Sequence, residues 1–106
     1  MKTDKFNEHT DPAIFLKLHF EEIKNKNPLY SLRAFAKKLQ CTTSTVSRVI
    51  SGKRAFTTDL ATRWIDSFEL NEKDQKLFFI LVMKKNSSSE FEKKLFTELF
   101  LILKSI

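Results

Sequence analysis

Residues that break helices are scarce in this sequence. The 106 residues include one glycine and two prolines, which leaves little material for the tight turns that join strands. Lysine, glutamate, leucine and phenylalanine are abundant, and 42% apolar with 30% charged residues is an ordinary composition for a soluble globular protein. A chain of this length folds as one domain around a single core. We therefore expect an all-α fold.

Cysteine and long apolar runs are also scarce. The single cysteine, Cys41, cannot form an internal disulfide and has no second thiol with which to bind zinc. The longest apolar runs, 77–83 and 99–103, are far too short to span a bilayer. The first ten residues, MKTDKFNEHT, lack the apolar run of a secretory signal. We expect a cytoplasmic, nucleoid-associated protein that makes no membrane contact.

Patterns that carry catalysis or metal binding are missing as well. His9 and His19 have no cysteine, aspartate or second histidine at ligand spacing. Ser44 and Ser47 lack a histidine partner in the sequence, and Cys41 has no evident base. We expect no enzymatic activity, no metal, no cofactor and no small-molecule ligand.

Acidic residues are absent from the middle of the chain. Between Glu22 and Asp59 there is none, while eight positive charges fall in the same stretch. They are Lys24, Lys26, Arg33, Lys37, Lys38, Arg48, Lys53 and Arg54. The remaining 11 basic and 13 acidic residues give −2, so the whole formal charge of +6 is concentrated in this stretch. Such a concentration is typical of a nucleic-acid-binding element.

The segment from Ser31 to Arg54 predicts two short helices joined by a tight turn. Ser31 caps the first helix, whose buried stripe recurs at i, i+3, i+4 and i+7. That stripe consists of Leu32, Phe35, Ala36 and Leu39. Gln40 and Cys41 form the turn, and Thr42 caps a second helix that runs to Ser51. A helical wheel places Val46, Val49 and Ile50 together and Ser44, Ser47, Arg48 and Ser51 on the opposite face, with Thr43 at its edge.

Four further helices complete the expected domain organisation. Residues 1–10 are expected to form a flexible arm, and residues 11–85 the helix-turn-helix domain. Within that domain, helices are expected from Pro12 to about Lys26, from Phe56 to Leu70, and from Asn71 through the apolar run that ends at Met83. Residues 86–106 are expected to form a linker and a C-terminal helix, opened by the capping-box pair Ser89 and Glu92.

The central segment resembles the helix-turn-helix of the lambda-repressor or Xre class. The resemblance lies in Ala36, the capping Thr42, Val46 and the closing Ser51 to Arg54. More broadly, Phe15 to Met83 resembles the N-terminal part of a family of larger helical proteins numerous in predatory bacteria, through FLKLHFEEIKNKNPLYSLRAFAKKL and LNEKDQKLFFILV. Those larger proteins continue with a long helical domain that this sequence lacks. Gln40 stands where the Xre class usually has a glycine in a left-handed conformation, so we expect a strained or differently wound turn.

The resemblance implies a DNA-binding regulator, repressor-like in type, with residues 43–51 in the major groove of double-stranded DNA. It implies base contacts by Thr43, Ser44, Ser47 and Arg48, and contacts near phosphates by Thr42, Lys53 and Arg54. If the first of the two helices crosses the DNA backbone, Ser31, Arg33 and Lys38 are further candidates for phosphate contact. Only Arg48 can bind guanine through two hydrogen bonds, so shape readout is expected to matter.

The C-terminal helix is apolar around most of its circumference. Its apolar residues are Phe91, Leu95, Phe96, Leu99, Phe100, Leu101, Ile102, Leu103 and Ile106. We expect a symmetric homodimer through Leu95, Leu99, Ile102, Leu103 and Ile106, which would present two recognition helices to half-sites about 34–36 Å apart. Two alternatives stay open: the helix completes the monomer core, or the chain is an adaptor that binds another protein through this helix or the helix-turn-helix surface. A membrane-surface protein is disfavoured because the basic and the exposed apolar residues lie on different helices.

Overall fold

A computed structural model describes residues 5–106, and all the regular structure in these residues is helical, as expected. The α-helices are α1 (Pro12–Lys26), α2 (Leu32–Lys38), α3 (Thr43–Ile50), α4 (Thr58–Trp64), α5 (Glu72–Asn86) and α6 (Glu90–Ser105). A short 3₁₀ segment, η1 (Ile65–Phe68), lies between α4 and α5. No helix in the described part of the chain is both long enough and apolar enough to cross a membrane.

Every α-helix begins after a residue whose side chain accepts a hydrogen bond from a first-turn N–H. The donor–acceptor distances of these caps lie between 2.7 and 3.2 Å. The capping residues are Asp11, Ser31, Thr42, Thr57, Asn71 and Ser89. The caps satisfy N–H groups that the helix itself leaves without partners, so they set where each helix starts.

The segment expected as one helix from Phe56 to Leu70 is divided. α4 ends at Trp64, and the chain tightens into η1 and then turns at Glu69, whose φ of 54° lies in the left-handed region. Phe68 and Leu70, on either side of this turn, are both buried. The division therefore brings both apolar side chains into the core, which a continuous helix would not do.

The core is built largely from aromatic side chains. Trp64, Phe35 and Phe78 are among the largest side chains that are fully buried, and the Phe78 ring lies 5.2 Å from that of Phe15 and 5.6 Å from that of Phe68. Most of these ring pairs are tilted or edge-to-face, which is the favoured arrangement for aromatic pairs. The apolar middle of α5 is central to this core, since Leu77, Phe78, Leu81 and Val82 are all buried.

The expectation of a flexible arm over residues 1–10 needs correction. Residues 1–4 lie outside the described residues, but Phe6 is only 2% exposed and its ring lies 5.0 Å from that of Phe15. Lys84 Nζ donates to the carbonyl oxygen of Glu8 at 3.0 Å, and Lys104 Nζ donates to that of Phe6. The segment from Phe6 onward is held in place because an aromatic side chain and two backbone carbonyls have partners on the helical body.

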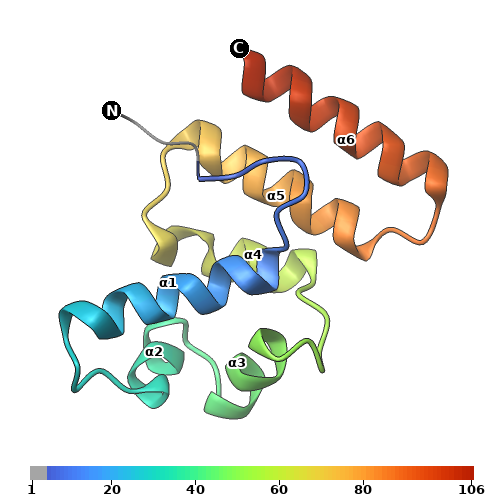
Figure 1. The fold of residues 1–106 in the computed structure, drawn as a ribbon. Coiled ribbons are helices and arrows are strands. Elements are labelled where there is room, and N and C mark those ends of the chain that lie inside the picture. Colours follow the sequence, from blue (N-terminus) through green and yellow to red (C-terminus); the bar gives the residue numbers. More distant parts are fainter. Residues whose placement is uncertain (1–4) are drawn as a thin grey trace.

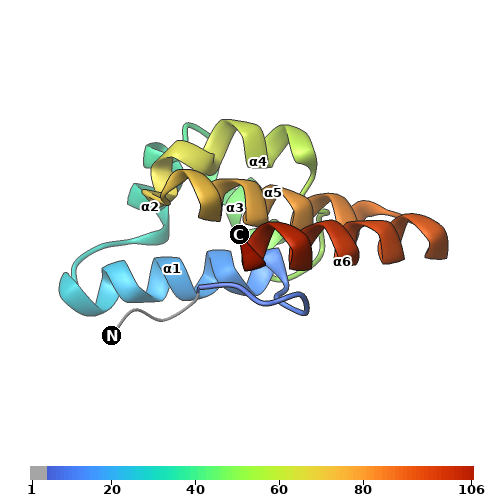
Figure 2. The same cartoon turned by 90° about the horizontal axis from the view of Figure 1, so that it is seen from above.

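The helices form a flat body with α2 and α3 at one end and α6 at the other (Figure 1). The body measures 42 × 35 × 18 Å. Figure 1 shows α2 and α3 at the lower end and α6 at the upper end, with α5 beside α6. Figure 2, seen from above, shows the same α5–α6 pair extending to one side of the body. Phe100, 1% exposed, attaches α6 to the core.

Candidate nucleic-acid interface

The turn between α2 and α3 has a specific hydrogen-bond pattern. Gln40 N–H donates to the Lys37 carbonyl at 3.0 Å, and Cys41 N–H donates to the Ala36 carbonyl at 3.0 Å. These two bonds, with a left-handed residue between them, are the Schellman motif that ends many helices. Gln40 is the left-handed residue, with φ of 57°. We expected either a strained turn or a differently wound one. The turn is the strained one, because glutamine adopts the left-handed conformation that glycine usually supplies.

The same motif ends α3, here with glycine. Gly52 has φ of 80°, its N–H donates to the Val49 carbonyl at 3.1 Å, and Lys53 N–H donates to the Arg48 carbonyl at 2.9 Å. Arg54 N–H and the Ser51 hydroxyl also donate to the Arg48 carbonyl, at 3.1 and 3.2 Å. Three donors on one carbonyl fix the backbone of Lys53 and Arg54 at the C-terminal end of α3.

The start of α3 is tied to the same basic segment. Thr42 Oγ1 accepts from Thr45 N–H at 3.1 Å, and the two threonine hydroxyls are 2.9 Å apart. Arg54 Nη1 donates to Thr45 Oγ1 at 3.2 Å, so its guanidinium lies over the first turn of α3. Thr45 was not among the sequence candidates, although its spacing of three residues from the capping Thr42 could have indicated this role.

The expected base-contacting residues share one exposed face of α3. Thr43, Ser44, Ser47 and Arg48 are all exposed, while Val46 and Val49 on the opposite face are completely buried. Among the described residues, none of the basic side chains of α2, α3 or residues 53–54 forms an ion pair with a carboxylate. The face therefore carries short polar side chains, and Arg48 and the basic residues beside it make it positively charged.

Two of the three basic residues of α2 line a depression beside α3. Arg33 and Lys37, one helical turn apart, line a shallow depression of about 530 Å³ together with Gln40, Thr42 and Thr43. Lys38 does not line this depression, and its charge adds to the effect of burial in lowering the pKa of the His19 imidazole on α1. The structure thus adds Lys37 to the surface beside α3, while a phosphate contact by Lys38 stays a prediction. Ser31 is exposed, and its hydroxyl caps α2.

The histidine, cysteine and acidic side chains of the described residues form no metal site at this surface. No group of three or more His, Cys, Asp or Glu side chains within residues 5–106 is arranged to hold a metal ion. Partial burial raises the pKa of the Cys41 thiol, against the opposing effect of Arg54 and Arg63, and so disfavours the reactive thiolate. The chemistry that this surface offers is hydrogen bonding and positive charge.

Comparisons of the chain with protein-family models, with curated proteins and with solved structures found no match. The likeness to the Xre class therefore rests on the residues quoted for it above.

Proposed function

We propose that this chain binds duplex DNA sequence-specifically and acts as a repressor-like transcriptional regulator. In this proposal α2 and α3 form a helix-turn-helix of the Xre type. The observation that carries the proposal is the outer surface of α3 and its flanks. That surface combines exposed Thr43, Ser44, Ser47 and Arg48 with basic side chains on both sides that form no ion pair with any carboxylate of residues 5–106.

Each part of this surface suits one part of a DNA groove. The short side chains of Thr43, Ser44 and Ser47 allow the backbone of α3 to approach base edges, and their hydroxyls can pair with several bases. Among the four base-contacting candidates, Arg48 alone carries the planar fork that binds guanine through two hydrogen bonds. Direct readout is therefore limited to few positions, and DNA shape supplies part of the specificity.

Phosphate contacts are assigned to the flanks of α3. Arg33 and Lys37 lie on the α2 side and Lys53 and Arg54 at the C-terminal end of α3. The hydrogen bond to Thr45 uses one nitrogen of the Arg54 guanidinium and leaves other N–H groups for a phosphate. Such contacts fix the register of α3 on the duplex without reading sequence.

The first test selects bound duplexes from a random library and then measures affinity by fluorescence anisotropy at increasing salt. Four phosphate contacts per chain predict that affinity for one site falls roughly 100-fold between 50 and 200 mM salt, since each contact contributes about −0.9 to the logarithmic slope. A flat salt titration would refute DNA binding. Equal affinity for selected and random duplexes would favour the adaptor alternative, whose DNA binding is weak and without a preferred site.

The second test separates base from phosphate contacts. Arg48→Ala should cost about 1–3 kcal/mol on the selected site and relax one base position, whereas Lys53→Ala should weaken selected and random duplexes equally. Lys17→Ala, an exposed lysine on α1, is the matched control and should leave both affinities unchanged. If Arg48→Ala and Lys53→Ala behave alike on the two kinds of DNA, Arg48 does not read a base.

A further inference from the structure

A second apolar face runs along α6, on the side that the other described residues, 5–89, leave exposed. Its residues follow one another at spacings of four, four, three and four, the pattern of a helix that packs against another helix. Each is between 41% and 86% exposed. They are Phe91, Leu95, Leu99, Ile102 and Ile106, and are called the α6 stripe below.

The monomer core uses a different face of the same helix. Phe100 is buried, Phe96 and Leu103 are half-buried, and Lys104 reaches the carbonyl of Phe6. Leu103, which we expected in the dimer contact, is half-buried and packs against the core, and its part in a dimer contact stays a prediction. One face of α6 therefore completes the monomer core, and the α6 stripe remains exposed as additional apolar surface.

An apolar hollow lies next to the α6 stripe. It has a volume of about 510 Å³ and is lined by side chains of α4, η1, α5 and α6, among them Phe79, Ile80 and Met83. Leu103 lines it from α6 and lies one helical turn after Leu99. The hollow and the α6 stripe thus form one continuous apolar region.

We propose that the α6 stripe binds the α6 stripe of a second copy of this chain. The exposed fractions correspond to roughly 500 Å² of apolar surface per copy, which is the size of patch that marks an interaction site. Two copies together would bury at most about 1,000 Å² through the stripe alone, which is the lower limit for a specific interface. A second copy also presents the same residue spacing, so a twofold axis pairs the stripe with itself.

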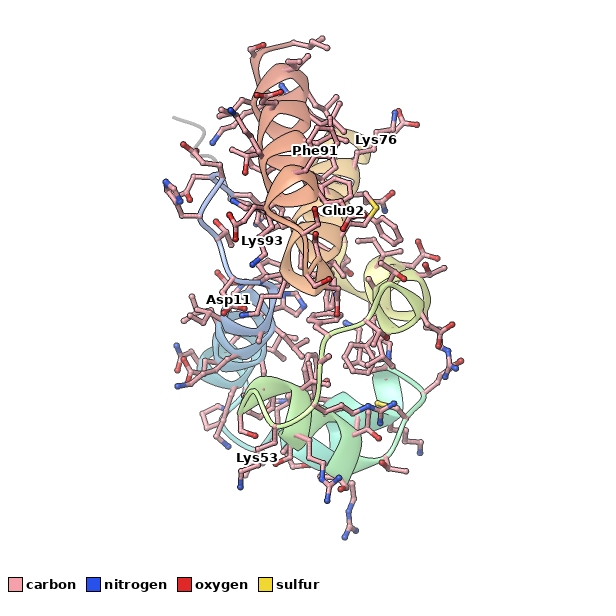
Figure 3. The ribbon with its side chains drawn as sticks, turned by 90° about the vertical axis from the view of Figure 1, so that its right-hand side faces the viewer. Asp11, Lys53, Lys76, Phe91, Glu92 and Lys93 are labelled. Carbon is pink, nitrogen blue, oxygen red and sulfur yellow. The ribbon has the colours of Figure 1, made fainter. Side chains whose placement is uncertain are left out.

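The position of α6 determines what such a dimer does with DNA, a conclusion that rests on the proposed function. Lys53, beside α3, lies at one end of the molecule, and Phe91 lies on α6 towards the other end (Figure 3). The α6 stripe lies on the face of α6 that does not contact the core, so a twofold axis through the stripe places the two copies of α3 at opposite ends of the dimer. The dimer therefore joins two separate DNA segments. The expectation of adjacent half-sites about 34–36 Å apart does not fit this arrangement.

The dimer itself is tested by light scattering on the 106-residue chain at micromolar concentration. The expected mass is twice 12.5 kDa. The double variant Leu99→Lys with Ile102→Lys should give a mass near 12.5 kDa with unchanged helical circular dichroism. Leu101→Lys is the matched control, because Leu101 is an exposed apolar residue of α6 outside the α6 stripe, and this variant should remain a dimer. A monomeric wild-type chain, or a monomer produced by Leu101→Lys as well, would overturn the proposal.

Bridging is tested with one duplex on a bead and a second, fluorescent duplex in solution. The wild-type dimer should retain the fluorescent duplex, and the Leu99→Lys, Ile102→Lys variant should not, although it binds a single site with wild-type affinity. Loss of single-site affinity in that variant would show that both copies contact one site and would overturn the bridging arrangement. A dimer in which every variant fails to bind DNA would refute the proposed function and bridging, and leave the contact between copies standing.

Discussion

Two helix ends in this molecule share one hydrogen-bond pattern but have different residues at the left-handed position. Gly52, with φ of 80°, occupies that position after α3, and Gln40, with φ of 57°, occupies it after α2. A side chain in this conformation brings Cβ close to the following carbonyl oxygen, at a cost of roughly 1–2 kcal/mol. We therefore predict that Gln40→Gly stabilises the protein.

The expected gain can be worked out from what the substitution removes. Gln40 is exposed, and no side-chain hydrogen bond of Gln40 is found in the described part of the chain, so little contact is lost. Glycine also increases the entropy of the unfolded chain, which offsets about 0.4–1 kcal/mol of the stabilisation gained by removing the strain. The net gain is about 0.5–1 kcal/mol, or a rise in Tm of about 2–8 °C for a domain of this size.

Gly52→Ala is the reciprocal variant. A Cβ at Gly52 would meet no atom within 4 Å, so any loss of stability comes from the backbone conformation alone. We expect a loss of about 1 kcal/mol.

Urea unfolding followed by circular dichroism measures both variants, with the m-value unchanged. Destabilisation by Gln40→Gly, or a neutral Gly52→Ala, would show that the left-handed turns are not present in solution. DNA affinity should stay the same in Gln40→Gly, because glycine adopts the same turn and keeps the orientation of α3.

Two further predictions concern the core. Phe6→Ala should lower the free energy of unfolding by about 3–5 kcal/mol, the usual cost of removing a buried phenylalanine, and urea unfolding would contradict the packed N-terminal segment if the loss were below about 1 kcal/mol. His19 packs against the rings of Phe15 and Phe68, and its buried Nε2 has no hydrogen-bond partner among residues 5–106. Burial, with a further contribution from Lys38, lowers its pKa from 6.5. The unfolded chain therefore binds the proton more tightly, so stability should be fully present above pH 6.5 and fall as the pH drops through the lowered pKa. His19→Phe should remove this pH dependence. If the free energy of unfolding of the variant still falls as steeply with decreasing pH as that of the wild type, His19 is not its cause.

The helix starts could be predicted because a cap depends on residues only three or four apart. Thr42 and Ser89 accept from first-turn N–H groups as their local sequence indicates. The capping box is only half formed, however, because Glu92 Oε1 accepts from the Ser87 hydroxyl at 2.7 Å and does not bond the Ser89 N–H. The exposed face of α3 followed in the same way from helical periodicity, since Val46 and Val49 had to be buried together.

Features that depend on distant residues were not predictable from local pattern. Residues 1–10 look like a polar arm, and only the position of Phe15 and Phe78 in space shows why Phe6 is buried. Lys37 and Lys38 are neighbours in the sequence, but only Lys37 lines the depression beside α3. Leu103 differs from Leu99 in the same way, because both are apolar residues of α6 but only Leu103 faces the hollow beside α5.

Separation of the two proposed surfaces limits which DNA targets a dimer would favour. Binding two sites on one DNA molecule gains from the high effective concentration of the second site only if the intervening DNA can bring both sites to opposite ends of the dimer. DNA has a persistence length of about 150 bp, so sites separated by much less require costly bending. Two sites a few helical turns apart would therefore bind as independent sites. Well-separated sites on one DNA, or sites on two molecules, would be joined, and such a dimer would repress by looping or compacting DNA as well as by blocking a promoter.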